Sequence, residues 1–225
     1  MLNNKALIDR KSCLIFDLDG TLIHSAETII SALESAFRKL QIAPIKPINI
    51  TLIGPPLNHL LLELLPKESE YLLPDISACF REFYDNFFCV QCTLYPNVID
   101  ALEYLKLSKR LFVVTNKREM PTKRILKHFN LDHFFEHIYS IDSISKQGAT
   151  KKDVISNLLS EKNLKPKDCV YIGDTAHDME SCLAVPVDFI FAEWGYGDCQ
   201  NHQISRSENI MDLISCDFAS SKGLK

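Results

Sequence analysis

The chain has 225 residues, of which 46% are hydrophobic and 24% are charged, as in an ordinary soluble globular protein. This length allows a substantial core and one or two domains. The net charge of −4 supplies no basic surface for a polyanion, so nucleic acid is not an expected partner. No segment has the length and apolar character of a membrane span or a signal peptide, so we expect a cytoplasmic protein with no membrane partner.

A short apolar stretch near the N-terminus, residues 14–16, predicts a buried strand that ends in acidic side chains. Asp17 and Asp19 follow it directly, and the chain turns at Gly20. Two neighbouring carboxylates repel each other, and their burial is costly unless a cation or a proton intervenes. The pattern therefore indicates a metal site. The plainer alternative is a strand end whose acids form a turn before Gly20.

Residues 24–92 show helical periodicity. An apolar stripe predicts a helix from Ser25, its N-cap, to about residue 40. A Leu-rich helix over 60–65 and a third helix over 76–88 follow. A crossover between parallel strands needs only about 30 residues. We therefore interpret the block as an inserted domain that lies outside the sheet.

From residue 93 onward, strands alternate with helices. We expect strands at 111–114, 137–140, 169–172 and 187–191, and helices that include residues 98–105, 121–129, 154–159, 179–183 and 210–214. Such alternation predicts a parallel sheet covered on both faces. The predicted fold is α/β, with a Rossmann-like parallel sheet formed by residues 1–23 and 93–225 and an all-helical cap formed by residues 24–92.

Two of the later strands also end in polar side chains. The strand that ends at residue 114 is followed by Thr115 and Asn116, and the strand that ends at residue 172 is followed by Asp174 and Asp178. Ligands bind beyond the carboxyl ends of the strands in open parallel sheets, so these side chains should meet the two aspartates of the first strand. Several carboxylates without histidine suit Mg²⁺ better than zinc.

Two adjacent lysines, Lys151 and Lys152, precede the predicted helix over 154–159. Neighbouring helix positions point about 100° apart, so only one of the lysines can face the site. Both lie near the apolar stripe of that helix, so periodicity does not distinguish them. Either lysine could donate hydrogen bonds to phosphate oxygens.

The order of these elements resembles the four motifs of the haloacid dehalogenase-like (HAD) hydrolase superfamily. The matching elements are DLDGT at 17–21, the strand end at Thr115, a lysine that opens a helix, and GDTAHD at 173–178. The loops GPPL at 54–57 and WGYG at 194–197 are similar to those of phosphoglycolate phosphatases. The resemblance covers nearly the whole chain. It implies a magnesium-dependent phosphatase for a small phosphoglycolate-like phosphomonoester, enclosed by a mobile cap.

The resemblance also implies a role for each site residue. Asp17 is the nucleophile that forms an aspartyl-phosphate, and Asp19 protonates the leaving oxygen and then activates water. Thr115 and Asn116 bind the transferring phosphoryl group. Lys151, which occupies the family's Lys-x-x-Val-Ile position, neutralises its charge. The implied Mg²⁺ ligands are Asp17, Asp19, Asp174 and Asp178.

Other functions share the same motifs. A 5′-nucleotidase, a pyrophosphatase and a sugar phosphomutase of the superfamily all remain open, as does the choice between monomer and homodimer. A noncatalytic phospho-accepting regulatory protein is a remoter alternative, because such modules are about half this length and have no helical insertion. His24, where relatives usually carry an acid, bears on the substrate, and we expect it and His177 in exposed loops.

Overall fold

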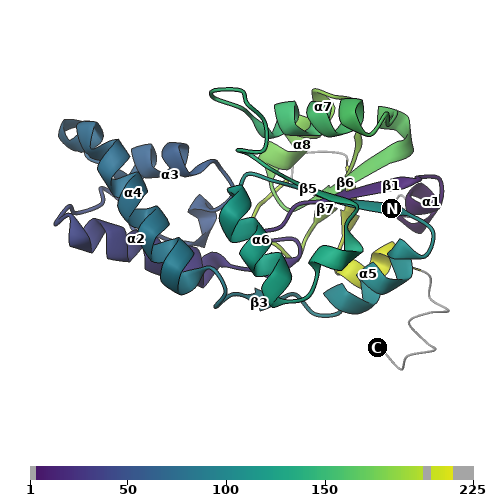
Figure 1. The fold of residues 1–225 in the computed structure, drawn as a ribbon, viewed down its shortest axis with the longest axis horizontal. Helices are drawn as coiled ribbons and strands as arrows, with labels where there is room; N and C mark the ends of the chain where they lie inside the picture. Colours follow the sequence, from purple (N-terminus) through teal and green to yellow (C-terminus); the bar gives the residue numbers. More distant parts are fainter. Residues whose placement is uncertain (1–3, 200–203, 215–225) are drawn as a thin grey trace.

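The computed structural model describes residues 4–199 and 204–214. Its centre is a six-stranded parallel sheet in the order β5-β4-β1-β6-β7-β8 (Figure 1). The strands are β1 (Cys13–Phe16), β4 (Arg110–Thr115), β5 (His137–Ser140), β6 (Cys169–Gly173), β7 (Asp188–Ala192) and β8 (Ser205–Ser207). The predicted parallel sheet is confirmed, and the first strand, β1, lies in its middle between β4 and β6.

Both faces of the sheet are covered by helices, as predicted. Leu14 and Phe16 of β1 pack into one apolar cluster, whereas Cys13 and Ile15 pack into another on the opposite face. This division follows from the alternating side chains of a strand, and it explains why β1 is apolar throughout. One face carries α5 (Val98–Lys106) and α6 (Glu119–His128); the other carries α7 (Lys151–Glu161) and α8 (Ala176–Leu183) (Figure 1).

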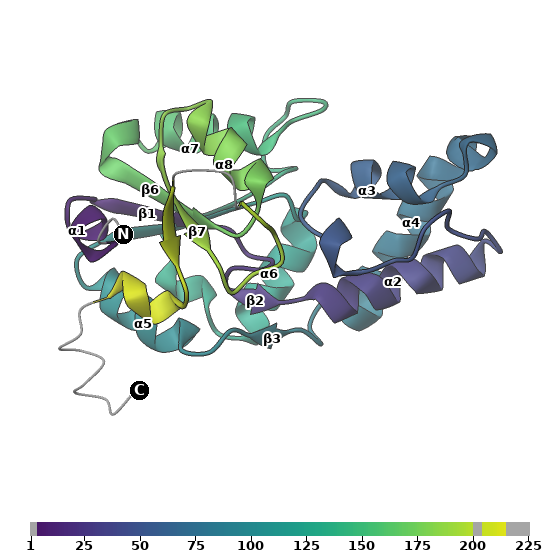
Figure 2. The ribbon, with the colours of Figure 1, turned by 180° about the vertical axis from the view of Figure 1, so that it is seen from behind.

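The helices of residues 24–92 lie together beside the sheet (Figures 1 and 2). They are α2 (Ala26–Lys39), η1 (Ile50–Leu52), α3 (Leu57–Leu64), η2 (Lys67–Leu72), α4 (Leu73–Phe83) and η3 (Tyr84–Phe88). The chain enters this block through β2 (Ile23–His24) and leaves it through β3 (Thr93–Leu94), and these two short strands pair antiparallel. The two chain connections between this block and the sheet region therefore lie side by side.

Some elements differ from the sequence-based expectation. The third helix ends at Phe83 and continues as the π-helix η3. The expected helix over 210–214 is only the 3₁₀ turn η6 (Ile210–Leu213), and residues beyond 214 lie outside the described part. Three short elements have no apolar stripe long enough to predict and were missed: α1 (Asn4–Asp9), η4 (Asp132–Phe134) and η5 (Pro166–Asp168). The polar strand β8 was missed for the same reason. Within residues 4–199 and 204–214, no helix is long and apolar enough to cross a membrane.

Candidate active site

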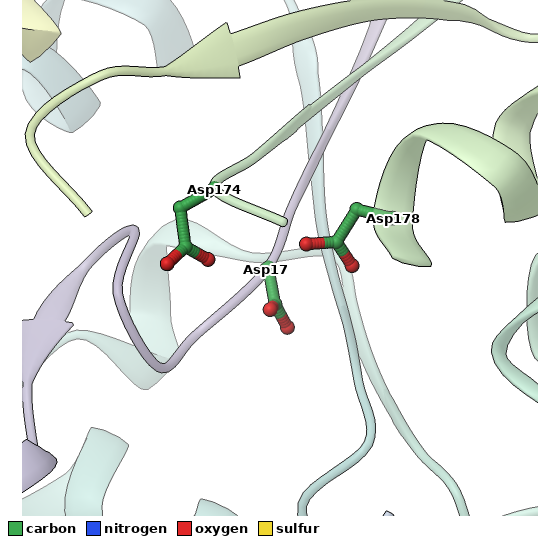
Figure 3. A group of neighbouring side chains, drawn as sticks. All are labelled: Asp17, Asp174 and Asp178. Atoms are coloured by element: carbon green, nitrogen blue, oxygen red, sulfur yellow. The ribbon is translucent and has the colours of Figure 1, made fainter. Parts of the chain in front are cut away.

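Three buried carboxylates meet at the carboxyl edge of the sheet (Figure 3). Asp17 follows β1, Asp174 follows β6, and Asp178 lies in the first turn of α8. One carboxylate oxygen from each residue lies within 4.8 Å of those from the other two. The strands themselves bring these residues together, because β1 and β6 are neighbours in register. The arrangement is dense in negative charge and excluded from water.

Two of these carboxylates have a buried oxygen that no group of residues 4–199 or 204–214 satisfies. Oδ1 of Asp17 and Oδ1 of Asp174 are buried without a hydrogen-bond partner among the described residues, whereas Oδ2 of Asp174 accepts the backbone N–H of Tyr196 at 2.8 Å. Unpaired buried acceptors are costly and rare in native proteins. A hard cation with oxygen ligands, such as Mg²⁺, would satisfy both atoms, so the residues fit such an ion.

Asp178 differs because its oxygens already have protein partners. Oδ2 accepts the backbone N–H of Thr175 at 3.1 Å and the hydroxyl of Thr175 at 2.6 Å. The first of these bonds, together with the bond from the Asp178 N–H to the Thr175 hydroxyl at 3.1 Å, forms the capping box of α8. Oδ1 accepts a hydrogen bond from Lys151. Asp178 thus fixes the helix start and the lysine at the same time. A direct bond from Asp178 to a metal stays a prediction.

The carboxylates carry shifted pKa values. Burial raises the pKa of Asp17 to about 7; Lys151 opposes this rise, and Asp178 and Asp19 add to it. Burial, followed by repulsion from Asp178 and Asp17, raises the pKa of Asp174 well above its usual range. A bound cation would reverse this shift, because it favours the charged form of both side chains.

Lys151 is the only one of the two adjacent lysines that reaches these carboxylates. Its side chain is 2% exposed, and its Nζ lies 3.1 Å from Oδ2 of Asp17 and pairs with Asp178. Lys152 is exposed. Burial lowers the pKa of Lys151, but Asp17 and Asp178 outweigh that effect and hold the pKa above its usual value. The ammonium therefore stays charged beside Asp17.

Thr115 and Asn116 lie at the end of β4 and line the same cavity. The hydroxyl of Thr115 is buried and accepts the backbone N–H of Lys117 at 3.2 Å. Asn116 donates through Nδ2 to the carbonyl of Gly54 at 3.1 Å, while its buried Oδ1 has no hydrogen-bond partner in the described part of the chain. Asn116 thus contacts the helical block, and the binding of phosphate by these two residues stays a prediction.

Asp19 has different partners from the three clustered carboxylates. Its Oδ1 lies 3.1 Å from Nζ of Lys117 and accepts the hydroxyl of Ser25. Ser25 was expected to cap α2, yet its side chain makes no cap hydrogen bond, because the hydroxyl is engaged by Asp19. The side chain of Asp19 is not a member of the three-carboxylate group. Its role as a metal ligand stays a prediction.

A cavity of ≈520 Å³ separates the helical block from the edge of the sheet. Asp17, Asp19 and Thr115 line it from the sheet, and apolar side chains such as Ile53, Leu57 and Phe80 line it from the helical block. Its size is typical of a site for a small organic molecule. A ligand in this cavity would contact both parts of the chain.

Comparison with known proteins identifies the family. The family model of haloacid dehalogenase-like hydrolases matches residues 14–192, which is most of the chain. The chain belongs to this family. A HAD-like hydrolase from Streptococcus pneumoniae has a similar structure, with a TM-score of 0.81 at 28% identity over 91% of this chain and 97% of that one.

Two kinds of relative stand out. The phosphoglycolate phosphatase of Aquifex aeolicus is 33% identical over 89% of this chain and 95% of its own length. The tyrosine-protein kinase PtkA of Mycobacterium tuberculosis is 30% identical over 82% of this chain, and the matched part is 62% of its length. The chain therefore spans less than two thirds of the kinase relatives.

In this HAD-like chain, the loop after β7 packs against Asp174 and the DLDGT turn. Trp194 donates through Nε1 to the carbonyl of Thr21 at 2.9 Å, so the only tryptophan links the loop to the DLDGT turn. Gly20 has a φ of +77°, and a Cβ there would lie 2.0 Å from Oδ2 of Asp174. A Cβ on Gly195 would lie 2.1 Å from Cβ of Asp174. Both glycines are needed because the backbone surrounds that carboxylate.

Sequence reasoning missed two residues of the HAD-like site. The sequence predicts an exposed loop for His177, but this residue is half-buried in the first turn of α8 and lines the cavity. Its Nε2 is buried and has no hydrogen-bond partner among the residues that the structure describes. Burial, and then the charge of Lys151, lower its pKa. Lys117, to which the sequence patterns give no role, has a buried side chain beside Asp19. Their proximity to Asp178 and Thr115 in the sequence was the available signal.

Proposed function

We propose that this chain is a magnesium-dependent phosphatase that hydrolyses a small phosphoglycolate-like phosphomonoester through an aspartyl-phosphate on Asp17. The observation that carries the proposal is the pair of unsatisfied buried oxygens of Asp17 and Asp174 beside the ammonium of Lys151. Similarity to phosphoglycolate phosphatases over nearly their whole length supports the substrate class.

Asp17 and Asp174 would hold the metal, with Asp178 orienting Lys151 beside them. When bound, Mg²⁺ would offset the negative charge of the carboxylates and of the substrate phosphate. Lys151 contributes a second positive charge that is fixed by two ion pairs. Such charges, arranged before the reaction, stabilise the phosphoryl group as it is transferred.

The first half of the reaction forms a bond between a carboxylate oxygen of Asp17 and phosphorus. The bond from phosphorus to the leaving oxygen breaks, and Asp19, in its protonated form, gives its proton to that oxygen. Thr115 and Lys151 orient the transferring group from the ends of β4 and α7. The product is an alcohol, and the phosphoryl group stays on Asp17.

The second half of the reaction hydrolyses this acyl phosphate. Asp19, now a carboxylate, accepts a proton from water as the water oxygen attacks phosphorus. The bond from phosphorus to Asp17 breaks, which restores the carboxylate and releases inorganic phosphate. The helical block, residues 24–92, would act as the cap that excludes bulk water during these steps. In this proposal, residues 1–23 and 93–225 form the catalytic core domain.

The test is a phosphate-release assay over a panel of phosphomonoesters, nucleotides and pyrophosphate, with Mg²⁺ and with a chelator. We expect hydrolysis of phosphoglycolate-like esters that the chelator removes. Asp17→Asn barely changes volume and should lower turnover by about 10⁴-fold or more, as loss of a nucleophile does. Asp132→Asn, at an exposed position, is the matched control. Wild-type rates in Asp17→Asn would contradict the covalent mechanism.

The kinase relatives define a second arm of the same assay. The protein is incubated with ATP, and phosphate bound to tyrosine is measured beside free phosphate. Hydrolysis of small esters without labelled tyrosine supports the proposed phosphatase. Phosphate on tyrosine without hydrolysis of any ester would mean that a tyrosine hydroxyl, and not water, accepts the phosphoryl group. That result would overturn the proposal.

A further inference from the structure

Lys117 is a buried cation that the reaction described above does not use. It follows Thr115 and Asn116 at the end of β4, and its side chain is 7% exposed. Its Nζ lies 3.1 Å from Oδ1 of Asp19 and donates to the hydroxyl of Tyr84 at 2.7 Å. The same Nζ lies 4.4 Å from the centre of the Tyr84 ring. One ammonium therefore contacts both Asp19 and a phenol from the helical block.

The charges of this group favour a fixed geometry. Burial lowers the pKa of Lys117, but Asp19 and Tyr84 outweigh burial and hold the pKa above its usual value. Burial raises the pKa of Tyr84, so its phenol stays neutral and can accept the hydrogen bond. A buried ammonium keeps its position only where its hydrogen bonds are satisfied, so both partners matter.

Tyr84 belongs to η3, the π-helix that ends the helical block. This element is also attached to the core through Asp85: the guanidinium of Arg118 pairs with the Asp85 carboxylate, and Arg124 donates to the Asp85 carbonyl. π-Helices are rare overall, and those that occur are often found at functional sites. The contact between Lys117 and Tyr84 thus exists only while η3 is seated on α6 and the end of β4.

We propose that Lys117 is a positioning residue that, together with Tyr84, holds the carboxyl of Asp19 in the orientation for proton transfer when the helical block is seated. This inference rests on the proposed phosphatase function. Oδ1 of Asp19 is engaged by Lys117 and Ser25, which leaves Oδ2 to exchange a proton with the leaving oxygen. Proton transfer to the leaving group is thereby coupled to the seated position of the helical block.

The test compares two leaving groups. The leaving oxygen of an alkyl phosphate needs a proton. The leaving group of p-nitrophenyl phosphate is a stable phenolate that departs without one. kcat/KM reports the steps up to phosphoenzyme formation, so it includes this proton transfer and excludes phosphoenzyme hydrolysis. Lys117→Met should lower kcat/KM for the alkyl ester by about 10²-fold, the cost of a misplaced catalytic group. For p-nitrophenyl phosphate the loss should be no more than a few-fold. Lys123→Met, on the exposed face of α6, is the matched control.

Two further variants keep the proposal falsifiable. Tyr84→Phe retains the buried ring and should give the same preference for the good leaving group with a smaller loss, about tenfold. In Asp19→Asn, adding Lys117→Met should cost little more for the alkyl ester, because residues that act as one unit are not additive. Melting temperatures confirm that each variant is folded.

Equal losses for the two esters, or additive losses in the double variant, would overturn the role of Lys117. An inactive wild-type protein would instead remove the proposed phosphatase function. The two failures are therefore distinguishable.

Discussion

Two buried lysines pair with the two aspartates of the DLDGT turn, and they differ in what else they touch. Lys151 contacts Asp17 and Asp178, all within the sheet and its covering helices. Lys117 contacts Asp19 and Tyr84, and Tyr84 comes from the helical block. Asp17, the proposed nucleophile, is thus held within the core, whereas Asp19, the proposed general acid and base, is held partly by the helical block.

This difference indicates how the chain could limit proton transfer by Asp19 to the arrangement in which the helical block contacts the core. The ion pairs among Asp17, Lys151 and Asp178 involve no residue of the helical block. The geometry of Asp19, in contrast, depends on η3 lying against the core. Movement of the helical block away from the core would then change proton transfer by Asp19 more than it changes phosphate binding.

The largest expected effect is on turnover, and it tests whether Asp19 has a different role from Asp17. Asp19→Asn should lower turnover by about 10²–10⁴-fold, the usual contribution of a general acid or base. With p-nitrophenyl phosphate, phosphoenzyme should accumulate, because formation needs no proton but hydrolysis needs a base. Protein-bound phosphate after rapid quenching measures this. Absence of accumulation, with both steps equally slow, would mean that Asp19 does not have the separate role assigned here.

The next effect concerns the lysine that stays within the core. Lys151→Met keeps the bulk of the stem but removes the charge, and should cost about 3 kcal/mol of transition-state stabilisation, like other removed electrostatic donors. The loss should be equal for alkyl and aryl esters, unlike that of Lys117→Met. Lys152→Met, at the exposed neighbour, should change kcat/KM little. A larger loss at 152 than at 151 would reverse the assignment.

Metal and pH should act together on stability. The pKa of Asp17 is raised from its ordinary value of 3.8 to about 7 without metal, so its contribution to folding is present below 3.8 and is lost as pH rises through 7. The metal-free protein should therefore melt at a lower temperature at pH 8 than at pH 5.

Mg²⁺ competes with these protons, so it should stabilise more at pH 8. At a hundredfold excess over Kd the gain is about 2.7 kcal/mol, or about 5–10 °C for a chain of this size. Differential scanning calorimetry with Mg²⁺ and with chelator measures this gain in melting temperature. Asp17→Asn should reduce the difference between the gains at pH 5 and at pH 8. A magnesium effect independent of pH would argue against these carboxylates as the ligands.

The smallest expected effect lies in the helical block, at Gly54. Its φ is +130°, and a Cβ would lie 2.9 Å from Cγ2 of Thr175. Gly54→Ala should therefore shift the loop that lines the cavity and alter relative rates among large phosphoesters by a few-fold, with less change for a small one. Rates over the substrate panel test this. A uniform loss would instead indicate a role in folding.

Much of the fold was predictable because it depends on local patterns. Buried strands such as β1 and β6 are continuous apolar runs, and the polar residues that end them reveal the active edge. Asp17 and Asp174 could be assigned because parallel strands place their ends together. The 3.6-residue period also located α2 and α7, whose apolar stripes face the core.

The rest depends on contacts between distant segments. Ser25 looks like a helix cap, but its hydroxyl is engaged by Asp19, and no local rule includes that partner. Lys117 looks like an ordinary charged residue at a helix start; its burial arises only because Tyr84, 33 positions earlier, lies over it. Periodicity left Lys151 and Lys152 equivalent. The family resemblance selects Lys151, and the packing of α7 on the sheet places that lysine beside Asp17.

The phenol of Tyr196 links the loop after β7 to the start of α2. Its oxygen accepts the backbone N–H groups of Ser25 at 2.6 Å and Ala26 at 3.1 Å, at the start of α2. The backbone N–H of the same residue donates to Asp174. Any swing of α2 against the sheet must therefore either carry the loop with it, and pull on the metal-site carboxylate, or exchange those two hydrogen bonds for water. The start of α2 and the candidate metal site are thus both hydrogen-bonded to one residue, Tyr196.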